Sequence, residues 1–111
     1  MKFSILIANY NNGKFFKDCY DSILSQNYDN WEAIILDDAS TDNSLEIIND
    51  LIKEDHRFKV FKNQQNNGVG ITKSKLINLA NGEICGFVDP DDAITPNAIS
   101  SSINIFEKHK K

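Results

Sequence analysis

Three carboxylates stand close together in the run Phe87-Val88-Asp89-Pro90-Asp91-Asp92. Two negative charges about 5 Å apart repel each other by roughly 3 kcal/mol at an effective dielectric constant near 20. Such a group favours a partner that neutralises it, and a divalent cation that carries a phosphorylated ligand suits it well. A surface turn whose acids cap the following helix is the alternative interpretation. The apolar residues before the run predict a buried strand that ends in these acids.

A second acidic cluster, Asp37-Asp38-Ala39-Ser40-Thr41-Asp42, follows the apolar segment Ala33-Ile34-Ile35-Leu36. Because Ser, Thr and Asp commonly cap helices, Asp42 is interpreted as a structural residue at a helix start. Asp38 falls at the predicted strand end, where its carboxylate can accept a hydrogen bond from a base N–H or a ribose hydroxyl. Two strand ends that finish in acids suggest one site.

Two further segments offer groups that could contact a ligand. Asn9-Tyr10-Asn11 places an aromatic ring where it can stack on a nucleobase, although a loop tyrosine also serves ordinary packing. Gly68-Val69-Gly70-Ile71-Thr72-Lys73 is superficially similar to a dinucleotide fingerprint. Lys occupies the last Gly position of that pattern, and a polar loop separates the segment from the preceding strand. We interpret the two glycines as turn residues and Lys73 as a candidate phosphate partner.

The elements that must position these groups alternate between strands and helices. Apolar runs predict strands at residues 3–8, 31–36, 58–61 and 83–88. Helical spacing predicts a helix after each strand, the last with Thr95 as N-cap and Pro96 as its first residue. The inner face of the first helix is predicted to hold Phe16, Tyr20, Ile23 and Leu24. That of the second is predicted to hold Leu45, Ile48, Leu51 and Ile52, and that of the last Ile99, Ile103 and Phe106. This order predicts an α/β fold with a mainly parallel central sheet, with ligands bound beyond the carboxyl ends of the strands.

The bulk composition narrows the class of protein. A chain of 111 residues, 41% hydrophobic and 25% charged, predicts one folded domain over residues 1–111. Its net charge of −4 gives no support to nucleic-acid binding. Neither a signal peptide nor an apolar stretch of about 20 residues is visible, so we expect a cytoplasmic protein. Cys19 and Cys85 lack metal-ligand spacing and are predicted to be buried free thiols.

Taken together and in order, these segments resemble the nucleotide-sugar-binding half of the family 2 glycosyltransferases, which have the Rossmann-like GT-A fold. The opening Ser4-Ile5-Leu6-Ile7-Ala8-Asn9-Tyr10-Asn11 is similar to that family's first motif, and residues 31–42 resemble its second-strand signature. Four shorter matches complete the series: Ser22-Ile23-Leu24-Ser25-Gln26, Asn66-Asn67-Gly68, Ala80-Asn81-Gly82-Glu83 and the acidic run at residues 87–92. The resemblance spans Ser4 to about Ile103.

The resemblance implies a role for six residues. Ala8 would belong to the donor-binding site, Tyr10 would line the base pocket, and Asp38 would pair with the nucleobase. Lys73, which stands where the family usually has Arg, and Asp89 would lie near the ribose and diphosphate. Asp91 would contact Mn²⁺ or Mg²⁺. Ala8 replaces a common Pro or Thr, and Lys keeps the charge of Arg without its planar fork.

The implied chemistry is inverting transfer of a sugar from a nucleoside diphosphate donor to an acceptor hydroxyl. A UDP-sugar is the favoured donor, an acceptor glycan or lipid-linked saccharide is the expected partner, and bacterial polysaccharide assembly is the implied setting. The family's catalytic base lies far downstream of the acidic motif, so we expect it beyond Lys111. The chain is then expected to be a fragment, truncated before the acceptor-binding half and able at most to bind donor. Any attachment to the inner face of the cell membrane would come from missing regions.

Two other classes of protein remain as alternatives. One is a nucleotide-binding module without catalysis. The other is a receiver-type signalling domain, whose acidic pair follows the first strand, whereas the acids here follow the second and fourth. A haloacid-type phosphatase fits poorly for the same reason, because its acidic motif also follows the first strand.

Overall fold

The structure is a computed structural model that describes residues 1–109. Its strands are β1 (Phe3–Asn9), β2 (Trp31–Asp37), β3 (Phe58–Lys62) and β4 (Ile84–Phe87). Its helices are the 3₁₀ turn η1 (Gly13–Phe15) and α1 (Phe16–Leu24), then α2 (Ser44–Ile52), α3 (Val69–Leu79) and α4 (Ala98–Lys108). The predicted alternation of strands and helices is confirmed. Within the described residues, no helix has both the length and the apolar character needed to cross a membrane.

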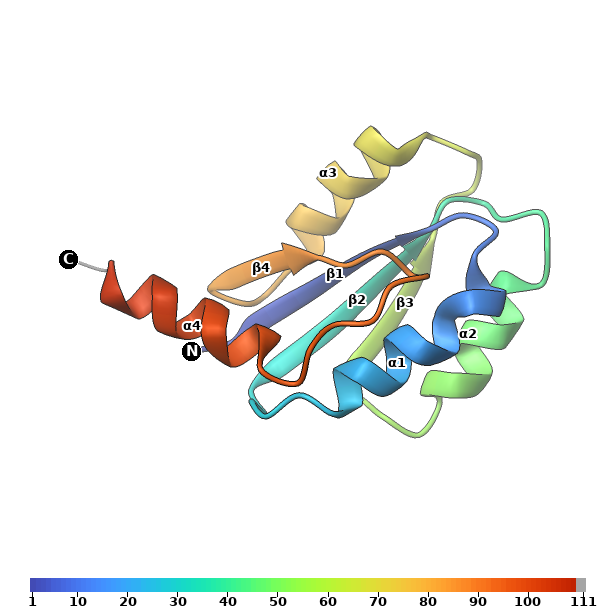
Figure 1. Ribbon diagram of the computed structural model, residues 1–111. Coiled ribbons are helices and arrows are strands. Elements are labelled where there is room, and N and C mark those ends of the chain that lie inside the picture. The colour runs from blue at the N-terminus through green and yellow to red at the C-terminus, as the bar shows by residue number, and fades with distance from the viewer. Residues whose placement is uncertain (110–111) are drawn as a thin grey trace.

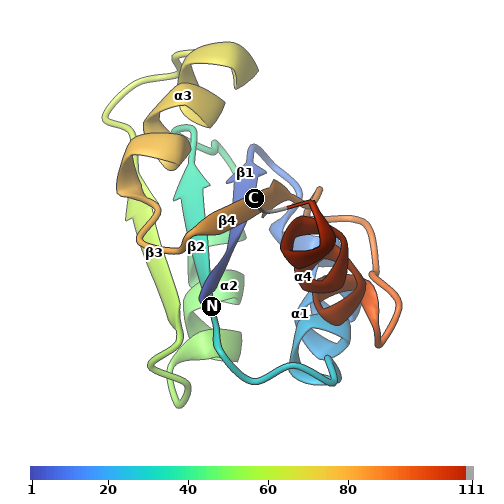
Figure 2. The same cartoon turned by 90° about the vertical axis from the view of Figure 1, so that its left-hand side faces the viewer.

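The sheet has the strand order β3-β2-β1-β4, and every strand pair is parallel. The chain therefore moves outward from β1 to β3 and then returns to the other side of β1 (Figures 1 and 2). Helices α1 and α2 lie on one face of the sheet, and α3, which makes the return, lies on the other (Figure 1). In open sheets of this kind, ligands bind where the direction of travel reverses. That point is the carboxyl edge between β1 and β4.

Two apolar layers hold the helices to the sheet. The larger layer joins β1 and β2 to α1, α2 and α4 through residues such as Ile5, Phe16, Ile35, Ile48 and Ile103. The smaller layer lies under α3 and contains Leu6, Ile34, Leu36 and Leu76. Because β1 and β2 are covered on both faces, buried residues follow one another along them instead of alternating.

The structure corrects three expectations about the elements around the acidic run. β4 is an edge strand with exposed Cys85 and Phe87, so it is not a buried strand, and the prediction of a buried Cys85 thiol is wrong. Cys19 is buried as predicted. Helix α4 begins at Ala98, after Asn97, so Thr95 is not its N-cap and Pro96 is not its first residue.

Physical reasons for the late start of α4 are visible in its contacts. The backbone carbonyls of Thr95 and Pro96 accept hydrogen bonds from the Gln26 side chain and from the Asn27 N–H. These two residues therefore fasten the end of α1 to the segment before α4. Two predicted inner-face residues, Leu24 and Phe106, are also exposed, and each lies in the last turn of its helix.

Candidate functional site

The carboxyl ends of β1 and β2 are joined by a network of polar side chains. Asp37, fully buried, accepts hydrogen bonds from the Asn9 side chain at 2.8 Å and from the Ser40 hydroxyl at 2.6 Å. Asn11, which has a positive φ of 57°, accepts a hydrogen bond from the Thr41 N–H with its side-chain oxygen. The loops after the two strands are thereby held against each other. Tyr10 lies between these anchors with its side chain partly exposed.

Asp38 organises the loop that leads into α3. Its side chain is 5% exposed and accepts hydrogen bonds from the Asn67 N–H at 2.7 Å, the Gly68 N–H at 2.9 Å and the Asn63 side chain at 2.9 Å. Burial alone would raise the pKa of Asp38, but the hydrogen bonds from Asn67, Asn63 and Gly68 outweigh it and hold that pKa below its ordinary value. Asp38 is therefore an ionised, buried carboxylate.

These loops enclose a pocket of about 250 Å³ at the carboxyl edge of the sheet. The pocket brings together three of the six predicted site residues, Ala8, Tyr10 and Asp38. The remaining lining residues, which we did not predict as ligand contacts, are Asn9, Asn66, Gly68, Val69 and Thr72. We call this the base pocket, after the nucleobase that the sequence resemblance implies there. Asn9 could have been found from the sequence, because it is the polar residue that closes an apolar strand.

Lys73 and Asp89 lie together in a second pocket, of about 340 Å³, beside β4. The Lys73 ammonium stands 5.1 Å from the centre of the Phe87 ring. Thr72 lines the base pocket and Lys73 lines the second, so neighbouring residues in the first turns of α3 belong to the two pockets. Phe87 was not predicted as a site residue. Its side chain is exposed because β4 is an edge strand, which the sequence did not reveal.

The acidic loop, residues 89–92, follows β4 as a turn closed by a hydrogen bond from the Asp92 N–H to the Asp89 carbonyl. The Asp89, Asp91 and Asp92 side chains are exposed, and each offers a carboxylate oxygen within 4.8 Å of the others. An all-carboxylate donor set of this size fits a hard divalent cation such as Mn²⁺ or Mg²⁺. The sequence predicted Asp91 as the metal-contacting residue and did not single out Asp92.

Asp42 lies outside both pockets. Its carboxylate accepts a hydrogen bond from the Ser44 N–H at 2.9 Å, at the start of α2. Hydrogen bonds from Ser44, first from its side chain and then from its N–H, hold the pKa of Asp42 below its ordinary value. The interpretation of Asp42 as a structural residue is confirmed.

Comparison with known proteins agrees with this architecture. The chain is 38% identical to the glycosyltransferase GlyG of Streptococcus pneumoniae over 98 residues, which are 88% of this chain and 33% of GlyG. It superposes with a TM-score of 0.89 on residues 1–349 of S. aureus TarS, solved in complex with UDP-GlcNAc. The identity is 28%, and the match covers 98% of this chain and 32% of that fragment. A mannosyltransferase of Pyrobaculum calidifontis, solved with GDP-Man and Mn²⁺, shares the fold with a TM-score of 0.84 and 18% identity over 91% of this chain and 31% of that one.

The chain thus spans about one third of the length of GlyG and of the solved TarS fragment, and 20% of the longer TarS chain. The structural neighbours share its parallel sheet and alternating helices, the GT-A fold. The family model for glycosyl transferase family 2 matches residues 4–111 and leaves the receiver-type alternative without support. The chain belongs to glycosyl transferase family 2.

Proposed function

We propose that this chain binds the donor, a nucleoside diphosphate sugar, for a glycosyltransferase that passes the sugar to an acceptor hydroxyl with inversion. The observation that carries the proposal is a pair of pockets at the carboxyl edge of the sheet, lined by neighbouring residues of α3. One contains the Tyr10 ring, and the other contains Lys73 together with Asp89 and Asp92 of the acidic loop. The similarity to TarS, which was solved with UDP-GlcNAc, supports a UDP-sugar as the donor.

In this proposal the nucleobase lies in the base pocket against the Tyr10 ring. A carboxylate has about four acceptor positions, and the protein fills three of those of Asp38. The Thr72 hydroxyl also donates to Asp38, so an N–H of the base would share the carboxylate with that hydroxyl or displace it. The small side chain of Ala8 leaves room for the base beside the end of β1.

The diphosphate would then reach the second pocket. Lys73 offers a positive charge there, and Asp89 lies in the same pocket toward the ribose and diphosphate. Asp91, with Asp89 and Asp92, would hold Mn²⁺ or Mg²⁺. When bound, such an ion supplies positive charge that stabilises the diphosphate as a leaving group. The chain's own residues bind and orient the donor around it.

The acceptor side of the reaction is proposed to depend on more than these residues. Activation of an acceptor hydroxyl needs a general base within hydrogen-bonding reach, which we expect beyond Lys111. We therefore propose that the 111-residue chain binds donor without transferring it, in a cytoplasmic setting, and that the acceptor is a glycan or lipid-linked saccharide. Transfer of sugar by the isolated chain would contradict this part of the proposal.

A calorimetric titration tests the donor site. UDP and a panel of nucleoside diphosphate sugars are titrated with Mn²⁺ and with EDTA into the wild type and into Asp91→Asn. We expect binding that needs the metal and is lost in Asp91→Asn. Asp42→Asn, an exposed acid outside both pockets, serves as the matched control and should bind like the wild type. A folded wild type that binds no nucleotide would contradict the proposal.

A nucleotide-binding module without catalysis is the second candidate, because the same pockets would serve it. The two candidates differ in what a longer form of the protein does. Transfer from a UDP-sugar that stops in Asp91→Asn supports the glycosyltransferase, whereas tight nucleotide binding without transfer supports the module.

A further inference from the structure

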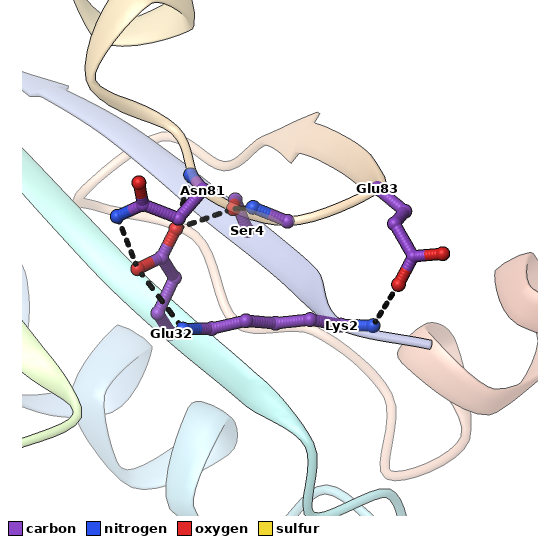
Figure 3. Close-up of polar contacts among 6 residues, drawn as sticks. Lys2, Ser4, Glu32, Asn81 and Glu83 are labelled. Carbon is purple, nitrogen blue, oxygen red and sulfur yellow. Dashed lines mark hydrogen bonds and ion pairs between the residues drawn. The ribbon is translucent and has the colours of Figure 1, made fainter.

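Glu32 is a buried carboxylate at the end of the sheet opposite the two pockets. It lies near the start of β2 and is 3% exposed. Its carboxylate accepts hydrogen bonds from the Ser4 hydroxyl at 2.6 Å and from the Asn81 N–H at 2.7 Å, and its Oε1 lies 3.5 Å from the Lys2 ammonium (Figure 3). Burying a carboxylate costs free energy unless such partners repay it. Removal of Glu32 would leave the buried Ser4 hydroxyl and the part-buried Asn81 N–H without this acceptor.

The contacts of Glu32 reach the connection between α3 and β4. Ser4, which donates to Glu32, accepts a hydrogen bond from the Gly82 N–H at 2.7 Å. Two consecutive backbone N–H groups, those of Asn81 and Gly82, are therefore tied to Glu32, the first directly and the second through Ser4. A Cβ added to Gly82 would come within 2.6 Å of the Ser4 Oγ, so the α3–β4 connection packs against β1 without room for a side chain.

Asp38 makes a matching arrangement at the other end of α3. It accepts the N–H groups of Asn67 and Gly68, the two residues before the helix. Helix α3 is thus held at both ends by carboxylates from β2 and the residue after it. Only Thr72 and Leu76 of α3 are buried, so apolar packing alone fixes its position weakly.

The site groups depend on that position. Lys73 is carried by α3, and the acidic loop follows β4, which begins directly after the segment that Glu32 holds. The base pocket differs, because Ala8, Tyr10 and Asp38 lie at the carboxyl ends of β1 and β2, and its two α3 residues, Val69 and Thr72, lie at the end of the helix that Asp38 holds. We infer that Glu32 is a positioning residue for the diphosphate half of the proposed donor site, acting through Ser4 and Asn81 on the register between α3 and β4. This inference rests on the proposed function.

The test compares two ligands that share the base but differ in the diphosphate. Uridine and UDP with Mg²⁺ are titrated separately into ¹⁵N-labelled wild type, Glu32→Ala and Glu32→Gln, with binding followed by NMR. We expect Glu32→Ala to weaken UDP binding at least tenfold and to change uridine binding less than twofold. Glu32→Gln should recover part of the loss, because its amide oxygen can still accept the Asn81 N–H. Glu83→Gln is the matched control, since exposed Glu83 accepts only the Lys2 N–H among the described contacts, and it should leave both affinities unchanged.

Amide hydrogen exchange at Asn81, Gly82 and Ile84 supplies a second readout, which we expect to quicken in Glu32→Ala and not in Glu83→Gln. If Glu32→Ala does not fold, Ser4→Ala removes the bridge to Gly82 and replaces it in the comparison. Equal loss of uridine and UDP affinity, or unchanged UDP affinity in a folded variant, would overturn the inference. A wild type that binds no UDP would contradict the proposed function instead, and unchanged exchange at Gly82 would then overturn the role of Glu32.

Discussion

Asp37 and Asp38 are neighbours in the chain, yet their carboxylates have different tasks. Asp37 joins the ends of β1 and β2 through Asn9 and Ser40. Asp38 turns the other way and fixes the segment before α3 through Asn67 and Gly68. The alternation of side chains along an extended backbone produces this division, because successive residues face opposite sides of the sheet.

Replacement of Asp38 tests its structural task separately from ligand binding. Asp38→Ala leaves two backbone N–H groups and the Asn63 amide without their acceptor. We expect a loss of roughly 2–4 kcal/mol in the free energy of unfolding. Urea unfolding of the unliganded protein measures it. Asp89→Ala, an exposed acid in the second pocket, is the control and should stay within about 0.5 kcal/mol of the wild type.

The two cysteines differ in burial and should therefore differ in reactivity. Burial raises the pKa of Cys19 to about 12, and the nearby charges of Asp92, Asp91 and Asp89 act in the same direction. Cys85 lies exposed on the edge strand. A thiol reagent at pH 8 should therefore modify Cys85 in the native protein and Cys19 only after unfolding. Cys85→Ser should abolish the rapid labelling of the native protein. Rapid labelling of Cys19 in the native protein would contradict the burial of that thiol.

At the scale of elements, α3 is the unit that links the two pockets to the rest of the sheet. It ends beside Gly82, where an added Cβ would come within 2.7 Å of the Lys2 carbonyl and 2.8 Å of the Ser4 nitrogen. Both atoms are backbone of β1 or its flank and cannot move aside. Gly70, in the first turn of the same helix, faces open space.

This contrast gives a matched pair of substitutions. Gly82→Ala should lower the free energy of unfolding by about 1–3 kcal/mol, because β1 and the connection to β4 must separate. Gly70→Ala should raise it by up to about 0.5–1 kcal/mol, since alanine loses less backbone entropy than glycine on entering a helix. Thermal and urea unfolding measure both. A tolerated Gly82→Ala would show that the connection is looser than its contacts indicate.

The elements also show how far local sequence pattern reaches. All four predicted strands are present, and their bounds differ from the predicted ones by one residue at most at each end. The exposure of β4 was not predictable, because an apolar run does not reveal whether the strand pairs on both sides. The early start predicted for α4 failed because the Thr95 and Pro96 carbonyls contact Gln26 and Asn27, far away in sequence.

The candidate site likewise contains residues that local sequence reveals and partnerships that it does not. Tyr10, Asp38 and the acidic loop could be found because each follows a recognisable strand, and the two pockets gather them at one edge. Three donors that hydrogen-bond to the Asp38 carboxylate, Asn63, Asn67 and Gly68, lie 25 to 30 residues further along the chain. No local pattern could reveal that partnership, nor the one between Glu32 and Asn81.

At the scale of the whole molecule, carboxylates with partners in the folded state make folding sensitive to acid, and two of them, Glu32 and Asp38, tie distant segments together. Burial by itself raises the pKa of Glu32, but hydrogen bonds from Ser4 and Asn81 outweigh it and leave that pKa below its ordinary value. The pKa of Asp55 is likewise lowered, first by its hydrogen bond from Arg57. With Asp38, these groups bind protons more weakly in the folded state than in the unfolded state.

The free energy of unfolding should therefore depend on pH in a defined direction. The contribution of these carboxylates is complete above their ordinary values of 4.5 for Glu32 and 3.8 for Asp38 and Asp55, and it is lost as the pH falls through the lowered folded values. Urea unfolding at pH 7, 5, 4 and 3 should show little change down to pH 5 and a steep loss below pH 4. Glu32→Gln cannot titrate at this position, so its curve should be flatter over that interval. Parallel curves for the two proteins would mean that acid acts on the fold through other groups, and that the Glu32 carboxylate is no better stabilised in the folded chain than in water.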